Sequence, residues 1–157
     1  MKIADKNMVL ESQDITAHKL IPKRFTGEGD NISPGFTIKY VPEGTRAFAL
    51  ICHDPDAPVV KTTGYGFMHW MLYNIPANIR TIDAGTKAYT QGLNDFGTLD
   101  YGGPMPPKGH GTHYYYYVLF ALDQNINLQE GLAEEIFFNK IAPHVIGMAR
   151  LVGVYKR

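Results

Sequence analysis

The sequence has few features that could cross-link the chain or anchor it to a membrane. Its 157 residues include one cysteine, Cys52, so no disulfide can form within the chain. No apolar stretch reaches the ~18 residues that a membrane-spanning helix needs. The opening residues, MKIADKNMVLESQD, lack the apolar region of a secretion signal. We therefore expect a soluble, cytoplasmic protein that has no export signal and does not insert stably into a membrane.

The chain also has no excess charge of either sign. Fifteen Lys and Arg balance 15 Asp and Glu, which gives a net charge of zero with His neutral. Neither the phosphate backbone of a nucleic acid nor an anionic membrane surface would therefore attract the chain strongly, so we expect no nucleic-acid partner. The hydrophobic fraction of 45% is typical of a globular protein. The length suits one domain that spans residues 1–157.

Short apolar segments between frequent turn residues predict β-strands. The chain has 16 Gly and 10 Pro, and the apolar residues between them mostly recur at every second position. A continuous short apolar segment, by contrast, is typical of a strand that is buried on both faces. The expected strands cover residues 36–40, 47–52, 68–75, 113–122 and 148–155.

Evidence for a helix is confined to one segment near the end of the chain. Asn127 is expected to cap this helix, Glu130 follows three residues later, and Ile136 and Phe137 lie on one side before Pro143. Several strands followed by one late helix predict a mainly β fold. We expect an antiparallel β-sandwich with one or two short helices.

A long segment with little periodicity, residues 77–111, separates two of the predicted strands. Loops of this length in compact domains are usually functional or disordered, and Phe96 and Tyr101 favour order here. The segment ends in PPKGHG at residues 106–111, where two prolines fix φ and two glycines allow the backbone to turn. Backbone N–H groups that converge in such a turn can hold an anion. An ordinary surface loop remains the alternative.

Two carboxylates follow the predicted strand 47–52, in the sequence HDPDAP at residues 53–58. Asp54 and Asp56 lie in a turn that proline stiffens, at a strand end, where binding groups often gather. The alternative is an Asx-type turn whose carboxylates are simply solvated.

Two histidines stand at the start of later predicted strands. His69 precedes Trp70, and His113 is followed two residues later by Tyr115 on the same face of its strand. Imidazole and phenol groups can both donate hydrogen bonds to phosphate or carboxylate oxygens. The alternative is that His69 has a structural role and that the tyrosines after His113 fill a core.

The strings DPDAP, HW and PPKGHGTHYY, in this order and at these spacings, resemble the phosphatidylethanolamine-binding protein family, which includes the Raf kinase inhibitor proteins. NISP, HWMLYNIP, NDFG followed by YGGPMPP, and LFALD are similar to its bacterial branch, and the resemblance covers roughly residues 25–155. It implies a β-sandwich of the Greek-key type with a small pocket for phosphate, phosphorylethanolamine head groups or similar anions. The residues that match this ligand-binding pocket are Asp54, Pro58, His69, Pro106, Pro107, Lys108, Gly109, His113 and Tyr115, and Asp56 lies in the same motif.

Two features depart from the family pattern. Tyr114 stands where the family usually has arginine, which removes a cation from a side chain that faces away from the His113 side of the strand. The chain also ends at Arg157, without the C-terminal helix of the eukaryotic members. Kinase regulation by those members therefore transfers poorly to this chain.

We expect a binding protein that uses no metal and no cofactor and has no catalytic residues. His69 and His113 would donate hydrogen bonds to a small phosphorylated or carboxylated ligand, loop N–H groups would complete the site, and Asp54 would orient an imidazole. Binding would then weaken as the pH rises from about 6 to about 8. Two alternatives stay open, a kinase or protease regulator that acts through a protein partner and a weak hydrolase. The resemblance also suggests a homodimer, and we expect Cys52 to be a buried, unreactive side chain.

Overall fold

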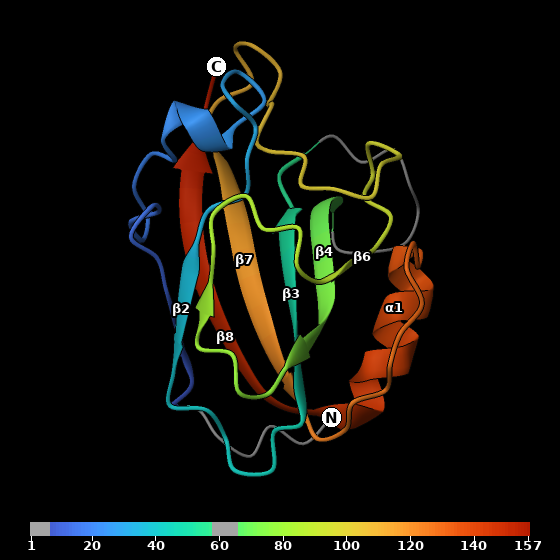
Figure 1. The fold of residues 1–157 in the computed structure, drawn as a ribbon. Coiled ribbons are helices and arrows are strands. Elements are labelled where there is room, and N and C mark those ends of the chain that lie inside the picture. Colours follow the sequence, from blue (N-terminus) through green and yellow to red (C-terminus); the bar gives the residue numbers. More distant parts are fainter. Residues whose placement is uncertain (1–6, 58–65) are drawn as a thin grey trace.

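The computed structural model describes residues 7–57 and 66–157, and within them the chain is mainly β (Figure 1). The strands are β1 Val9–Glu11, β2 Phe36–Lys39, β3 Ala47–Asp54, β4 Phe67–Pro76, β5 Thr81–Ile82, β6 Thr90–Gln91, β7 His113–Leu122 and β8 Val145–Tyr155. One α-helix, α1 Glu134–Ile141, and two 3₁₀ turns, η1 Lys23–Phe25 and η2 Ala142–His144, complete the described elements. The prediction of a mainly β fold with a short helix is therefore confirmed.

The strands form two antiparallel sheets. The small sheet has the order β1-β2-β5, and the large sheet has the order β6-β4-β3-β7-β8. Within the large sheet β7 returns to lie beside β3, so four of its strands have the order β7-β3-β4-β6, which is that of a Greek key. Figure 1 shows β2 on one side of the large sheet and α1 on the other. The architecture is therefore a sandwich with a helix on its outer face.

The large sheet is buried on both faces, which explains its continuously apolar strands. Phe48 and Leu50 of β3 belong to the core between the two sheets. Ala49 and Ile51 of the same strand belong to a second apolar cluster, which includes Phe137 of α1. Because side chains alternate between the faces of a strand, β3 has no polar face. The continuous apolar segment 47–52 thus does predict a strand buried on both sides.

The helix begins later than the sequence predicts. Its N-cap is Ala133, whereas Asn127 has a φ of 45° and precedes the helix by several residues. The backbone between Asn127 and α1 bonds to side chains of β4. The Asn74 side chain accepts from the N–H of Leu128 at 2.9 Å and donates to its C=O at 2.8 Å. The Tyr73 hydroxyl donates to the Gln129 carbonyl at 2.7 Å. These contacts with β4 hold the chain before α1 in a non-helical path, so the predicted Asn127 cap is wrong.

The long segment between β4 and β7 is ordered by its own side chains. It contains the short strands β5 and β6. The Asn94 amide donates to the Asp100 carbonyl at 2.6 Å, and the buried Tyr101 hydroxyl donates to the Phe25 carbonyl at 2.8 Å. The expectation that Tyr101 favours order is therefore consistent with its contacts in the structure.

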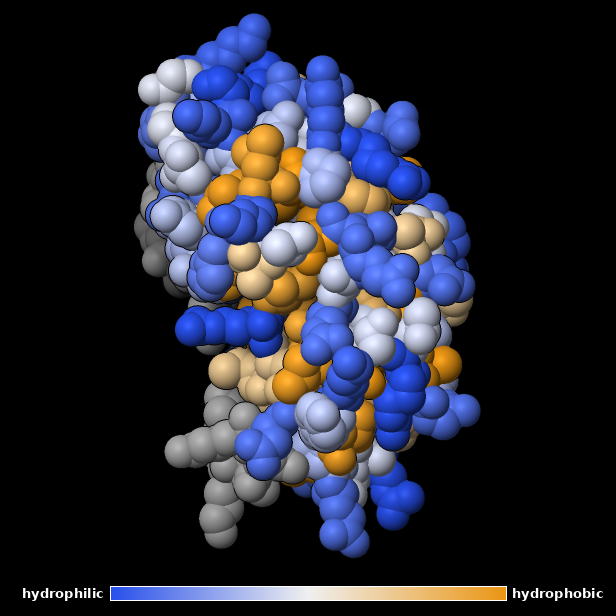
Figure 2. All heavy atoms as spheres, turned by 90° about the vertical axis from the view of Figure 1, so that its left-hand side faces the viewer, coloured by the Kyte–Doolittle hydropathy of each residue, from blue (hydrophilic) through white to orange (hydrophobic). Residues whose placement is uncertain are grey.

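The surface mixes polar and apolar side chains. On the side seen in Figure 2, which carries β2 and β8, blue hydrophilic side chains alternate with orange apolar ones. Within residues 7–57 and 66–157, no helix has the length and apolar character to cross a membrane.

Candidate functional site

A cavity of about 230 Å³ opens at one end of the large sheet. Strand β3 ends there at Asp54, and its antiparallel neighbours β4 and β7 begin there at Phe67 and His113. Residues from distant parts of the sequence therefore meet at one edge. Six of the predicted site residues line this inner cavity, namely Asp54, His69, Pro106, Pro107, His113 and Tyr115.

Asp54 and His113 form a buried pair in the inner cavity. The Asp54 Oδ2 to His113 Nδ1 distance is 2.6 Å, and each side chain is 2% exposed. The second Asp54 oxygen, Oδ1, accepts the N–H of Asp56 at 2.7 Å. An ionised carboxylate can only accept hydrogen bonds, so the proton of this pair sits on His113 Nδ1. Asp54 thereby fixes the orientation of the imidazole and leaves its Nε2 pointing away from the carboxylate.

A third residue, His110, continues this chain of hydrogen bonds. Its Nδ1 lies 2.6 Å from His113 Nε2, so one of these two nitrogens donates a proton to the other. His110 is exposed and lies between Gly109 and Gly111, whose φ angles of 75° and 91° favour glycine. The sequence indicates this loop as a candidate binding segment but does not single out His110 within it. Two features of the sequence could have indicated His110: it lies between two glycines, and it precedes His113 by three residues.

A β-bulge turns His69 into the inner cavity. Cys52 of β3 pairs with Trp70 and the next residue, His53, pairs with Met68, so His69 is an extra residue in β4. A bulge of this kind changes the direction of a side chain and is common beside functional sites. Regular alternation would place His69 on the face opposite to Trp70, which belongs to the core between the sheets.

The hydrogen bond of His69 determines what it offers to a ligand. Its Nδ1 lies 2.6 Å from the Gly102 carbonyl, which can only accept, so Nδ1 carries the proton. Burial lowers the pKa of His69 to about 4, so the ring is neutral near pH 7. In the neutral ring Nε2 is then an acceptor. A neutral His69 would therefore accept a hydrogen bond from a ligand rather than donate one, and its part in binding stays a prediction.

Tyr115 supplies a donor beside the two imidazoles. Its ring centroid lies 5.3 Å from that of His69 and 6.4 Å from that of His113. Burial, and next the negative charge of Asp54, raise the pKa of Tyr115 above its usual value, so the hydroxyl keeps its proton. Phe67 and Phe96 pack around His69 with centroids at 4.9 and 5.4 Å and give that wall an apolar surface.

Three of the remaining predicted residues, Asp56, Lys108 and Gly109, do not line the cavity. Asp56 is exposed, and its Oδ2 accepts the N–H of Tyr114 at 2.9 Å. Lys108 and Gly109 are exposed loop residues. Pro58 lies outside the described residues. Tyr114, which stands in place of the family's arginine, is 43% exposed and does not line this cavity.

The loop at the mouth does not present the expected set of free N–H groups. The Gly109 N–H donates to the Arg157 carbonyl and the His110 N–H donates to the Pro107 carbonyl, both at 3.1 Å. Pro106 and Pro107 have no N–H. Two of the four N–H groups in residues 106–111 are therefore bonded within the protein, so this run offers fewer donors to an anion than the sequence predicts.

Two further observations limit the chemistry of the cavity. Cys52 is fully buried and burial raises the pKa of its thiol, so it is not an activated nucleophile. In the described part of the chain, no group of three or more His, Cys, Asp or Glu is arranged to hold a metal ion. Asp54, His113 and His110 touch in a line and do not converge on one point.

Comparisons with known proteins agree with this architecture. The sequence model described as phosphatidylethanolamine-binding protein matches residues 11–156. The UPF0098 protein of Aquifex aeolicus is 39% identical over 144 residues, which cover 87% of this chain and 81% of that protein. In three dimensions, the chain is similar to CT736 of Chlamydia trachomatis, described as a homologue of phosphatidylethanolamine-binding protein. The TM-score is 0.88 at 31% identity, over 98% of this chain and 99% of the other.

The crystal structure of Escherichia coli YbcL, described as a new member of the mammalian phosphatidylethanolamine-binding protein family, is also similar. Its TM-score is 0.86 at 30% identity, and the match covers 96% of this chain and 98% of that one. The fold, the family match over nearly the whole chain and these similarities agree. The chain therefore belongs to the phosphatidylethanolamine-binding protein family.

Proposed function

We propose that this chain is a binding protein whose inner cavity takes a small phosphorylated ligand through a singly protonated phosphoryl group. The observation that carries the proposal is the pair of fixed imidazoles with opposite roles. Asp54 holds His113 through Nδ1, and in the charged form of the ring Nε2 carries a second proton that would point at a ligand. His69 is held through Nδ1 by the Gly102 carbonyl, so its Nε2 can only accept.

A phosphoryl monoanion matches this combination of groups. It carries one O–H that His69 Nε2 would accept, and oxygens that would accept from His113 and from the Tyr115 hydroxyl. A ligand oxygen would take the place that His110 Nδ1 occupies beside His113 Nε2. A carboxylate, which has no proton near pH 7, would leave the His69 acceptor facing another acceptor.

The size and the lining of the inner cavity support binding of a small group. Its volume of about 230 Å³ is below the ~300–1,000 Å³ of sites for drug-sized molecules. Among the described residues that line the cavity, none is a Ser, Thr or Cys that could act as a nucleophile beside an imidazole. A role in binding therefore fits this set of side chains better than nucleophilic catalysis does.

The proposal predicts a specific pH dependence. Because the pKa of His69 is lowered to about 4, this ring stays neutral from pH 5 to pH 8, and the ligand must bring the proton. The second pKa of a phosphate monoester is ~6, so the affinity for phosphorylethanolamine should fall as the pH rises through 6. The decrease should approach about tenfold per pH unit above that value, and calorimetric titrations between pH 5 and pH 8 would measure it.

Sulfate is a matched control, because it has the shape of phosphate but carries no proton in this pH range. We expect inorganic phosphate to bind about tenfold or more tightly than sulfate at pH 5.5, since sulfate would face the His69 acceptor without a proton. Equal affinities for the two ions, or a phosphorylethanolamine affinity that does not change with pH, would contradict the proposal.

A substitution at His69 tests the same point independently. Gln can turn its NH₂ group toward the ligand and donate, so His69→Gln should bring the ratio of phosphate to sulfate affinity close to one. His144→Gln is the matched control, because His144 bonds Asp123 on the surface and is not part of the inner cavity. The control should keep the ratio of the unmodified protein, and a high ratio in His69→Gln would refute the assigned role.

A further inference from the structure

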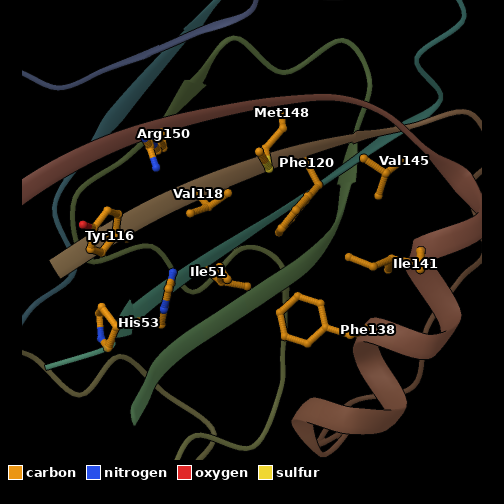
Figure 3. Close-up of a pocket in the computed structure, with 12 residues that line it drawn as sticks. Ile51, His53, Tyr116, Val118, Phe120, Phe138, Ile141, Val145, Met148 and Arg150 are labelled. Carbon is orange, nitrogen blue, oxygen red and sulfur yellow. The ribbon is translucent and has the colours of Figure 1, made fainter. Parts of the chain in front are cut away.

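A second cavity lies on the outer face of the large sheet, on the side that carries α1. Its volume is about 430 Å³, and Figure 3 shows its lining between the strands and the helix. Ile51 of β3 and Val118 and Phe120 of β7 form its floor. Phe138 and Ile141 of α1 form a wall. We call this feature the outer groove.

The outer groove is separated from the inner cavity by the sheet itself. Side chains alternate along β3 and β7, so adjacent residues serve opposite faces. Asp54 and Tyr115 line the inner cavity, whereas His53 and Tyr116 line the outer groove. A ligand in the outer groove would therefore not touch the residues proposed to bind phosphate.

One end of the outer groove carries a cation. Arg150 of β8 lies directly across from Val118, and its guanidinium carbon is 5.8 Å from the centroid of the Tyr116 ring. The His53 ring also stacks on the Tyr116 ring, and the two ring centroids are 5.4 Å apart. In the ranges 7–57 and 66–157, the structure shows no carboxylate within ion-pair distance of Arg150. The positive charge at this end is thus available to an anion.

The rest of the outer groove is apolar. Toward the helix, its lining is formed by Phe138, Ile141, Val145 and the 39% exposed Met148. Figure 3 shows Ile141 and Val145 at the end away from Arg150 and Tyr116, with Met148 between the two ends. A ligand that fits both ends must therefore have a negative head and an apolar body.

We propose that the outer groove binds an amphipathic monocarboxylate, with the carboxylate at Arg150 and an apolar tail that runs toward Val145. Arginine binds carboxylates through two parallel hydrogen bonds, which gives this end both charge and directional complementarity. The volume lies within the range of small-molecule sites. Arg150 and Val145 pair with Val118 and Leu122, which are four residues apart on β7, or about 14 Å in a strand. That length suits a medium-chain fatty acid such as decanoate.

Calorimetry with decanoate and decanol tests this proposal, because the two differ in charge but share the same tail. We expect one decanoate to bind per chain, and decanol to bind about tenfold or more weakly. Arg150→Gln should weaken decanoate binding by a similar factor and leave decanol binding nearly unchanged. Arg150 is exposed, so this variant should fold, and circular dichroism would check that it does.

The matched control is Arg80→Gln. Arg80 is an exposed arginine whose guanidinium bonds the Ala77 and Ile79 carbonyls, and it does not line the outer groove. It should leave decanoate binding unchanged. In NMR spectra of isotope-labelled protein, decanoate should shift the resonances of Val118, Phe120 and Ile141.

Three results would overturn the proposal. The first is no decanoate binding at millimolar concentration, and the second is equal binding of decanoate to the unmodified protein and to Arg150→Gln. The third concerns a second copy of the chain as the occupant. If sedimentation shows a dimer that Met148→Lys separates and decanoate does not, the outer groove is covered by a second copy and not by a monocarboxylate.

Discussion

Asp54→Ala should lower the free energy of unfolding by about 3–5 kcal/mol at pH 7, because it leaves the buried Nδ1 of His113 without its carboxylate acceptor. Both side chains are 2% exposed, so solvent cannot replace the lost contact well. The substitution also removes the acceptor of the Asp56 N–H. Urea denaturation followed by circular dichroism would measure the change.

Two further variants separate the pair from its surroundings. Asp56→Ala changes an exposed carboxylate of the same turn and should lower the free energy of unfolding by at most about 1 kcal/mol. The double variant Asp54→Ala/His113→Ala should lose less than the sum of the two single variants, because it leaves no unpaired imidazole. If Asp54→Ala and Asp56→Ala destabilise the protein equally, the buried pair does not have the role assigned to it.

Trp70→Ala should lower the free energy of unfolding by about 3–5 kcal/mol, because it removes the largest fully buried side chain of the core. Trp70 contacts the Tyr101 ring edge to face at 5.4 Å, and its Nε1 donates to Gln91 Oε1 at 2.9 Å. The residue after Tyr101 is Gly102, whose carbonyl holds His69. Trp70→Ala should therefore also reduce the preference for phosphate over sulfate.

Two controls show whether volume or hydrogen bonding is responsible. Trp70→Phe keeps an aromatic ring but leaves Gln91 without its donor, so it should destabilise the protein by about 1–3 kcal/mol. Tyr40→Ala removes an aromatic ring that is 70% exposed and should change the free energy by at most about 0.5 kcal/mol. An effect of Trp70→Ala no larger than that of Tyr40→Ala would contradict the described packing.

The strands of the large sheet could be predicted from the sequence because their composition is distinctive. The predicted strand 113–122 has the same bounds as β7, and the predicted strand 47–52 lies within β3. The short strands β1, β5 and β6 have only two or three residues, too few for a periodic pattern to appear. Long-range pairing, not local preference, makes these segments extended.

The start of the helix could not be predicted because contacts distant in sequence determine it. Asn127 and Glu130 form a plausible capping pattern, yet Tyr73 and Asn74 bond the backbone between Asn127 and α1. Similarly, the order of the motifs and the family resemblance suggested which residues would meet at the cavity. Neither could show that the Gly102 carbonyl would turn His69 into an acceptor.

The bulge at His69 lets the sheet hold a polar ring without giving up an apolar position. Met68 faces the outer cluster and Trp70 faces the core between the sheets, although both have even numbers. In a regular strand they would share a face, so the inserted residue exchanges the two faces near the start of β4. Both hydrophobic layers are continuous across the insertion. The His69 imidazole is therefore added beside the apolar side chains of β4 and replaces none of them. Its position depends on the one extra residue in this strand as much as on which residue it is.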